Sequence, residues 1–294
     1  MKFAVFTVST PTLTPEEVAP KLREYGYDGI EWRVVDEAPN PPGMGFWHGN
    51  KSTIPMTGFS GHVERMKTLA GDNNLEMPVL GTYVRSNDAW EDIEAAVQAA
   101  VALGVPKLRI NVPLYDGTQP FRPVWDKARE DYKRVEELVV KNNVQALIEI
   151  HHGTICPSAS ATRAFVEGLD PKYVGVIHDA GNMVHEGFEN LRMGFELLGE
   201  YLSHVHIKNA RWFPVKYLED KTVVWKCDWT AVHKGIVDMR QLVRVLAEIG
   251  YDGWISFEDF STERPIDDRL KGNIEFMKKI IAEAAQESAA TSGA

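Results

Sequence analysis

Four apolar runs of this 294-residue chain end in side chains of the kind that bind metal ions. The set comprises three carboxylates and one imidazole, which belong to Glu149, Asp179, His206 and Glu258. They stand in the segments LIEIHHG, VIHD, LSHVH and WISFE, and each segment predicts a buried strand with the ligand at or near its C-terminal end. Such a set suits a divalent cation like Mn²⁺ or Mg²⁺. The four residues therefore predict a catalytic metal site.

Each of these residues also has an ordinary explanation when it is taken alone. A carboxylate at a strand end often caps the next helix or pairs with a lysine. A single histidine such as His206 is often just hydrogen-bonded within a core. The metal site is favoured because a ligand-type residue stands near the end of each of four consecutive strands. In addition, three carboxylates buried together cannot all stay ionised without a cation.

The rest of the chain predicts the strands and helices that would position these ligands. Thr14-Pro15-Glu16-Glu17 marks the start of a helix that ends at Gly26. Strands are predicted at 3–8, 30–35, 79–84, 107–112, 145–151, 174–179, 203–208 and 254–260. Helices are predicted at 15–25, 60–74, 89–103, 124–142, 158–168, 188–200, 238–249 and 265–285. Eight strand–helix units predict an α/β fold, a single-domain (β/α)₈ TIM barrel over residues 1–285, with a doubly wound open sheet as the alternative.

In such a barrel the active site lies at the C-terminal ends of the strands. Side chains two apart in a strand share a face, so Glu149 would point with His151, and His206 with Lys208. One inward ligand from each of four consecutive strands can then meet at a single point.

Two connections, 36–55 and 210–235, are longer than the others. The first carries Phe46 and Trp47, and the second carries Trp212, Trp225 and Trp229. Both follow strands and would lie on the catalytic face, either as lids and binding loops or as surface insertions with small apolar clusters of their own. The small, polar tail 286–294 is predicted to be disordered.

Composition narrows the class of protein. A formal charge of −10 disfavours a nucleic-acid or anionic membrane surface. Cys156 and Cys227 form no CxxC pattern, which disfavours a disulfide framework or thiolate zinc site and fits a reducing compartment. The opening run Met1–Phe6 is too short for a signal peptide, and no segment approaches the roughly 20 apolar residues that span a bilayer. We therefore expect a soluble, cytoplasmic protein.

The motifs around the four ligands resemble those of a known family. Glu149 in IEIHH, Asp179 in HDAGN, His206 in HVHIKN and Glu258 in ISFED look like the metal ligands of the xylose isomerase-like TIM barrels. That superfamily includes ketose 3-epimerases, hydroxypyruvate isomerase, inosose dehydratase and endonuclease IV. The resemblance covers nearly the whole chain, and it implies one bound divalent ion, Mn²⁺ first, with Mg²⁺, Co²⁺ or Zn²⁺ as alternatives.

The resemblance also implies a reaction. The ion would chelate a carbonyl oxygen and a neighbouring hydroxyl, and a proton would be transferred beside the carbonyl through a metal-bound enediolate. In the epimerases, two metal-bound glutamates exchange protons with opposite faces of the substrate, and Glu149 and Glu258 hold those positions here. The alternative is that one or both act as ligands only.

Further residues are candidates for substrate contact. His151 and Lys208 share inward faces with Glu149 and His206, and the resemblance draws attention to Asn182 and Arg211. Lys208 could neutralise an enediolate or a phosphate, and many relatives place a substrate-binding arginine where Arg211 stands. His152 should point away from the site unless its strand has already ended. For each of these residues a structural hydrogen bond or ion pair remains an alternative.

Two positions depart from the family pattern, and a third residue is ambiguous. Asn182 stands where many relatives have histidine, and it can hydrogen-bond a hydroxyl but cannot shuttle a proton. Asn209 stands where many have aspartate. Glu31 near the end of the second strand could face the site, although an ion pair with Arg33 or a neighbouring lysine is the simpler expectation.

These features predict a metal-dependent isomerase or epimerase of a small sugar or polyol. The alternative is a lyase on the same site, either an inosose-type dehydratase or a β-eliminating enzyme on 3-keto glycosides. It would need an acid at the leaving oxygen, and the possible acids are His48, His151, His152 and His233.

A nuclease is disfavoured by the acidic charge and a ligand set for one metal, and a non-catalytic binding module remains a further alternative. A substrate phosphate is not indicated, because no cluster of arginine and lysine is evident. A homo-oligomer is an expectation by analogy with the family.

Overall fold

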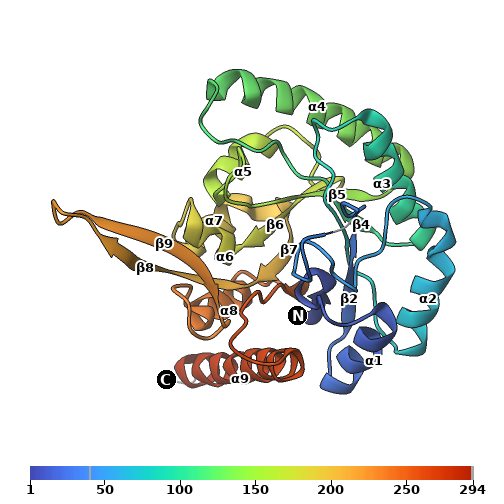
Figure 1. Ribbon diagram of the computed structural model, residues 1–294. Coiled ribbons are helices and arrows are strands. Elements are labelled where there is room, and N and C mark those ends of the chain that lie inside the picture. Colours follow the sequence, from blue (N-terminus) through green and yellow to red (C-terminus); the bar gives the residue numbers. More distant parts are fainter. Residues whose placement is uncertain (40, 293–294) are drawn as a thin grey trace.

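Eight parallel strands close into a barrel in the computed structural model, which describes residues 1–39 and 41–292 (Figure 1). The strands are β1 (Lys2–Phe6), β2 (Gly29–Val34), β3 (Leu80–Thr82), β4 (Lys107–Arg109), β5 (Gln145–Glu149), β6 (Val174–Asp179), β7 (Leu202–Ile207) and β10 (Trp254–Phe257). Around the barrel they follow in the order β1-β10-β7-β6-β5-β4-β3-β2. The predicted TIM barrel is confirmed, and the open-sheet alternative is wrong because β1 pairs with both β10 and β2.

Helices cover the outside of the barrel (Figure 1). They are α1 (Pro15–Tyr25), α2 (Val63–Asp72), α3 (Trp90–Leu103), α4 (Phe121–Asn142), α5 (Ala159–Val166), α6 (Ala180–His185), α7 (Leu191–Leu198), α8 (Met239–Glu248) and α9 (Ile266–Ser292). α1 begins with a capping box between Thr14 and Glu17 and ends at Gly26, whose φ of 85° suits glycine. Short α6 directly follows β6 and was not predicted from the sequence. None of the described helices is long and apolar enough to cross a membrane.

The C-terminal helix is longer than the sequence analysis predicts. α9 continues through Ser292, so residues 286–292 extend the helix where a separate disordered tail was expected, and residues 293–294 lie outside the described residues. The physical reason is the alanine-rich stretch around Ala284 and Ala285, because alanine has the highest helix propensity.

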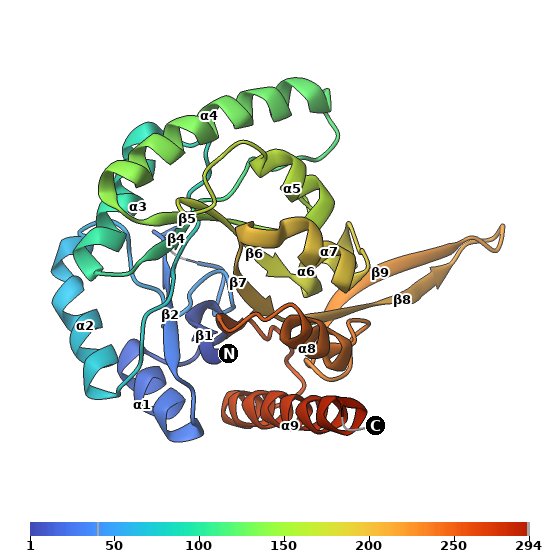
Figure 2. The same cartoon turned by 180° about the vertical axis from the view of Figure 1, so that it is seen from behind.

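The connection 210–235 is mostly a β-hairpin and only partly a loop. β8 (Asn209–Tyr217) and β9 (Val223–Thr230) form an antiparallel ribbon that projects away from the barrel (Figures 1 and 2). Its outer part exposes large side chains, including Tyr217 and Trp225. Only the inner end of the ribbon lies near the barrel strands, so only that end can reach an active site.

Packing inside the barrel places Phe6 of β1 against His206, one of the predicted metal ligands. The ring of Phe6 is fully buried, and its centroid lies 5.8 Å from that of His206. Gly81 in β3 leaves room for this ring, because a Cβ at that position would lie 2.2 Å from a Phe6 carbon. Burial of such a ring stabilises the fold by about 2–3 kcal/mol. The same contact fixes one side of the His206 imidazole.

Candidate active site

The four residues predicted as metal ligands meet at the C-terminal end of the barrel, and we call them the ligand cluster. The cluster consists of Glu149, Asp179, His206 and Glu258, all buried. His206 Nδ1 lies 3.3 Å from Glu149 Oε1. It lies 3.6 Å from Glu258 Oε2 and 3.9 Å from Asp179 Oδ2. One ligand atom from each residue lies within 4.8 Å of the other three, which is a spacing that can hold one cation.

Strand register explains why these side chains meet. Asp179 is the last residue of β6 and pairs with His206 of β7, which in turn pairs with Ser256 of β10. Glu258 lies two residues after Ser256 and so returns to the same face. Glu149 is the last residue of β5. Each ligand therefore stands where its strand ends and the barrel interior opens.

Lys208 places its ammonium group among the three carboxylates of the cluster. Its Nζ lies 2.8 Å from Asp179 Oδ2 and 3.6 Å from Glu149 Oε1, and it donates to Glu258 Oε2. Gly181 permits this approach of α6 to β7, because a Cβ there would lie 2.5 Å from Lys208 Cγ. Lys208 is therefore an internal counterion of the cluster.

The surrounding charges determine how the carboxylates ionise. Burial raises the pKa of Glu149, but Arg109 and Lys208 outweigh burial and hold this pKa well below its usual value. Burial also opposes ionisation of Glu258, yet Lys208 lowers its pKa. For Asp179, burial dominates and raises the pKa to about 7. Asp179 Oδ2 lacks a hydrogen bond of good geometry despite the nearby ammonium group. A divalent cation would satisfy this oxygen, so the residues fit a metal.

Glu31 of β2 holds the imidazole of His206 from the opposite side of the ring. Its Oε2 lies 3.2 Å from His206 Nε2 and 3.2 Å from His204 Nε2. Because Nε2 faces this carboxylate, Nδ1 is the nitrogen left for the ligand cluster. The expected ion pair between Glu31 and Arg33 is wrong, since Arg33 pairs with Glu37 at 2.5 Å.

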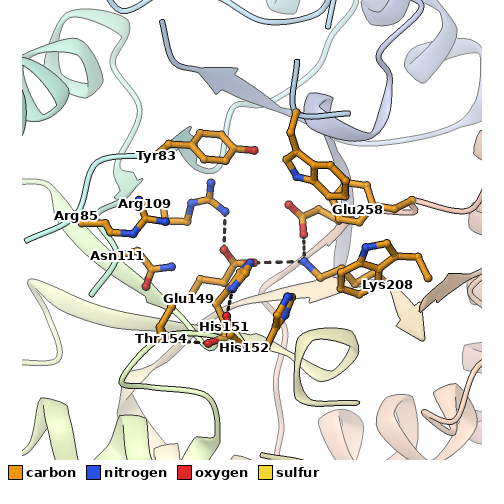
Figure 3. Close-up of a pocket in the computed structure, with 13 residues that line it drawn as sticks. Tyr83, Arg85, Arg109, Asn111, Glu149, His151, His152, Thr154, Lys208 and Glu258 are labelled. Carbon is orange, nitrogen blue, oxygen red and sulfur yellow. Dashed lines mark hydrogen bonds and ion pairs between the residues drawn. The ribbon is translucent and has the colours of Figure 1, made fainter. Parts of the chain in front are cut away.

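A cavity of about 220 Å³ adjoins the ligand cluster (Figure 3). Glu149, Glu258 and Lys208 are part of its lining. The other lining residues are aromatic or polar: Trp47, Tyr83, Trp229, Phe260, Arg85, Arg109, Asn111, His151, His152 and Thr154. This volume is below the roughly 300–1,000 Å³ of drug-sized ligand sites. The cavity therefore favours a ligand of about one ring.

The comparison with protein families agrees with this geometry. The model described as xylose isomerase-like TIM barrel matches residues 19–280. The chain belongs to this family. The resemblance found in the sequence motifs is thereby confirmed.

Several relatives of this xylose isomerase-like barrel have known names. Inosose dehydratase from Geobacillus thermodenitrificans is 23% identical over 156 residues, which cover 51% of this chain and 52% of that protein. The chain spans a little over half the length of the curated relatives that it matches first. The structure of an L-ribulose 3-epimerase has a TM-score of 0.72 at 16% identity and covers 99% of this chain and 98% of its own. A xylose isomerase-like TIM barrel protein from Mycobacterium smegmatis in complex with magnesium has a TM-score of 0.69 at 17% identity, over 96% and 97% of the two chains. At these identities the structural likeness shows the fold.

The structure brings some of the expected substrate contacts of this xylose isomerase-like barrel into the cavity and leaves others out. His151 and Lys208 line the cavity. Asn182 is buried and contacts Glu149 instead. Arg211 is exposed at the inner end of β8 and is not among the lining residues.

Asn182 connects a ligand to a cavity histidine. Its Nδ2 donates to Glu149 Oε1 at 3.2 Å and to the carbonyl oxygen of Ile150 at 3.1 Å. Its Oδ1 is therefore left to accept from His152 Nδ1 at 3.2 Å. His152 faces the cavity, contrary to the simple alternation, because β5 already ends at Glu149. Burial lowers the pKa of His152 to about 3, so its imidazole is neutral at physiological pH.

Two arginines in the cavity were missed in the sequence. Arg109 Nη1 pairs with Glu149 Oε2 at 2.5 Å, and Arg85 lies beside it (Figure 3). Strand alternation could have found Arg109. Lys107, Arg109 and Asn111 are polar residues two apart, so their side chains share one face of the strand and of its continuation. Arg85 follows β3 in a loop, where no periodic pattern marks it.

Aromatic residues from both long connections line the cavity. Trp47 comes from the segment 36–55, of which residue 40 lies outside the described residues, and Trp229 comes from β9. Their ring centroids lie 4.8 Å and 5.4 Å from that of Phe260. Trp212 and Trp225 are not among the lining residues, although the same connection carries them.

Asn209, the second departure from the family pattern, has a structural role. Its Nδ2 donates to the carbonyl oxygens of Val232 and Val237 at 2.8 Å and 3.0 Å. Its Oδ1 accepts from the backbone of Ala210 and Val237. Aspartate could not make the two donations, so asparagine fits the loop that follows the hairpin.

Proposed function

We propose that this protein is a divalent-metal-dependent isomerase or epimerase that acts on a small sugar or polyol by proton transfer beside a carbonyl. The observation that carries the proposal is a pair of buried carboxylates, Glu149 and Glu258, that line one ring-sized cavity and share a ligand cluster. The relatives include an L-ribulose 3-epimerase by structure, which supports the same class of reaction.

The four residues of the ligand cluster would hold the metal. Three carboxylates and one imidazole suit Mn²⁺ or Mg²⁺, and the magnesium complex of the Mycobacterium smegmatis protein supports an ion of this kind. When bound, such an ion supplies Lewis acidity, which polarises a carbonyl oxygen and acidifies the neighbouring C–H bond.

The two glutamates would exchange the proton. Both are held in the ionised form by neighbouring cations, so each can accept a proton from a substrate carbon. Arg109 fixes Oε2 of Glu149 at 2.5 Å, which orients the carboxylate. Abstraction by one glutamate, and delivery to the opposite face of a proton that the other glutamate has taken up from solvent, would give epimerisation, and the first glutamate would then release its proton to solvent. Lys208, bonded to Glu258, would stabilise the negative charge that develops on the substrate oxygen.

A lyase is the second candidate, because the matched curated relatives are inosose dehydratases. It shares the proton abstraction and adds an acid at the leaving oxygen. His151 and His152 line the cavity, but burial lowers the pKa of both. His48 and His233 are not among the lining residues. Neutral imidazoles are weak acids, which favours the isomerase or epimerase.

Exchange of substrate hydrogen with solvent tests the proposal. Protein loaded with Mn²⁺ is incubated in D₂O with ketoses, inososes and 3-keto glycosides, and deuterium at carbon is followed by NMR. We expect exchange in the wild type, loss in Glu149→Gln and Glu258→Gln, and no change in the control Glu94→Gln on the exposed face of α3. An ultraviolet-absorbing unsaturated product would assign the lyase. Absence of exchange with every compound would overturn the proposal.

A further inference from the structure

Arg85 differs from the other cations of the cavity in having no anionic partner. Its Nε is buried without a hydrogen bond, and its guanidinium forms no ion pair with any residue in the described ranges 1–39 and 41–292. Arg109, in contrast, pairs with Glu149, and Lys208 contacts three carboxylates. Arg85 is therefore a cation that lines a cavity whose two carboxylates, Glu149 and Glu258, are paired with Arg109 and Lys208 instead.

A partly buried cation without a partner is costly, and nearby charge increases this cost at Arg85. Burial and the charge of nearby Arg109 both lower the pKa of the Arg85 guanidinium, and only Asp88 opposes them. The Asp88 carboxylate accepts instead from the backbone N–H of Arg85 at 2.8 Å. A site that retains an uncompensated charge in a ligand cavity is suited to an anionic ligand.

Asn111 adds a neutral hydrogen-bond donor to the part of the cavity that Arg85 lines. Asn111 Oδ1 accepts from the backbone N–H of Val112 at 2.9 Å, which fixes the amide so that Nδ2 remains as a donor. Figure 3 shows Arg85, Arg109 and Asn111 on one side of Glu149, and Lys208 with Glu258 on the other. The unpaired cation thus belongs to the same cavity as the reacting carboxylates, and lies on the side of Glu149 away from Glu258.

We propose that Arg85, assisted by Asn111, binds a carboxylate of the substrate, so that the substrate is a sugar acid and not a neutral sugar. The inference rests on the proposed function for the sugar-like part of the substrate. A guanidinium presents its N–H groups in a plane that matches the two oxygens of a carboxylate. One unpaired guanidinium matches one singly charged group, whereas a phosphate carries nearly two charges.

The charge balance of the site points the same way. Arg85, Arg109 and Lys208 supply three positive charges, and the three carboxylates of the ligand cluster together with Glu31 beside His206 supply four negative charges. A divalent cation held by the cluster would therefore leave an excess of positive charge. A proton that moves from substrate to glutamate does not change this balance, but a carboxylate on the substrate reduces the excess.

Paired ligands test the inference without turnover. Hexuronates of gluco, galacto and manno configuration are compared with the corresponding hexoses by calorimetric titration at fixed ionic strength, with Mn²⁺ and without it. We expect at least one hexuronate to bind the wild type at least about tenfold more tightly than its hexose. Arg85→Gln should abolish that preference and leave hexose affinity within about twofold, and Arg85→Lys should retain part of it. The control Arg244→Gln, exposed on α8, should behave as wild type.

Three results would overturn the inference. The first is equal or absent binding of hexuronates and hexoses to the wild type. The second is a preference that survives in Arg85→Gln, which would mean that the metal or Arg109 binds the carboxylate. The third is tighter binding of hexose 6-phosphates that depends on Arg85, which would assign a phosphate instead. A failure of the proposed function appears separately, as missing hydrogen exchange with all compounds while the binding preference persists.

Discussion

The two halves of the barrel contribute to the site in different ways. The half formed by β5, β6, β7 and β10 supplies the whole ligand cluster, on residues that are buried and stand on or next to strand ends. The half formed by β1 to β4 supplies Arg85, Arg109 and Asn111, of which Arg85 and Asn111 lie beyond the strand ends. Metal ligands need fixed geometry, whereas substrate contacts need access to solvent. We call the first the proposed metal-binding half and the second the proposed substrate-binding half, although Lys208, Trp229 and Phe260 of the first half also line the cavity.

The largest expected effect is the loss of hydrogen exchange in Glu258→Gln, which is compared with a variant in the other half of the barrel. Glu258→Gln should lower the exchange rate by roughly 10³-fold, because it removes one of the proton-transferring groups. Asn111→Ala, in the proposed substrate-binding half, should raise KM by up to about tenfold and change kcat little. Steady-state kinetics on an identified substrate gives both values. Equal losses of kcat in the two variants would contradict the division.

Glu31 is the exception that sharpens the comparison, because it belongs to β2 but supports a metal ligand. Glu31→Gln should weaken Mn²⁺ binding about 10–100-fold, since the carboxylate orients His206 through Nε2. Metal affinity can be measured by fluorescence titration with Mn²⁺. The matched variant Glu37→Gln removes the partner of Arg33 and should leave metal affinity unchanged. Unchanged affinity in Glu31→Gln would place the β1–β4 half outside metal binding altogether.

The hairpin allows a comparison within one element. Trp229→Ala should raise KM about fivefold to tenfold, because its ring packs on Phe260 in the cavity wall. Trp225→Ala on the same strand should leave KM within about twofold, because that ring is 55% exposed and does not line the cavity. Similar effects in both variants would show that the whole hairpin, and not its inner end, contacts the substrate.

The smallest expected effect is on acid stability. Burial, with Lys208 and His151, lowers the pKa of His185 to about 4, and Asp228 opposes this shift. Between pH 6.5 and 4 the unfolded chain thus binds more protons than the folded protein, so stability falls as the pH falls. His185→Phe keeps a ring against His152 and removes the proton uptake, so the loss of Tm between pH 7 and pH 5 should be smaller than in wild type.

The control for this measurement is His233→Phe, at an exposed position. Its loss of Tm over the same pH range should equal that of the wild type. An unchanged loss in His185→Phe would show that acid sensitivity arises elsewhere, for example in the carboxylates of the ligand cluster.

The sequence was sufficient to predict which side chains form the ligand cluster, and insufficient to find the cations Arg85 and Arg109. Glu149 and Asp179 end strongly apolar runs, where a carboxylate is unusual enough to be noticed. Arg85 follows a short strand in a polar loop, where an arginine is common and unremarkable. Its lack of a partner depends on which carboxylates lie near in space, and no spacing along the chain contains that information.

The hairpin was missed for a related reason. The periodic patterns used for a barrel assume parallel strands separated by helices, and β8–β9 is an antiparallel ribbon outside that scheme. Strand ends were also uncertain by one or two residues, which was enough to direct His152 away from the cavity in the prediction. The position of such a side chain depends on where a strand stops, and the sequence locates that point poorly.

Lys208 has a consequence for how the protein matures. Because its ammonium group already neutralises part of the ligand cluster, we expect the barrel to complete folding before the proposed metal ion binds. In this respect it differs from small zinc domains, whose chains stay unfolded without their ion. The ion would be the last component to enter, and its loss would leave a folded protein ready to be reloaded. A protein built this way would gain and lose the proposed metal ion without unfolding.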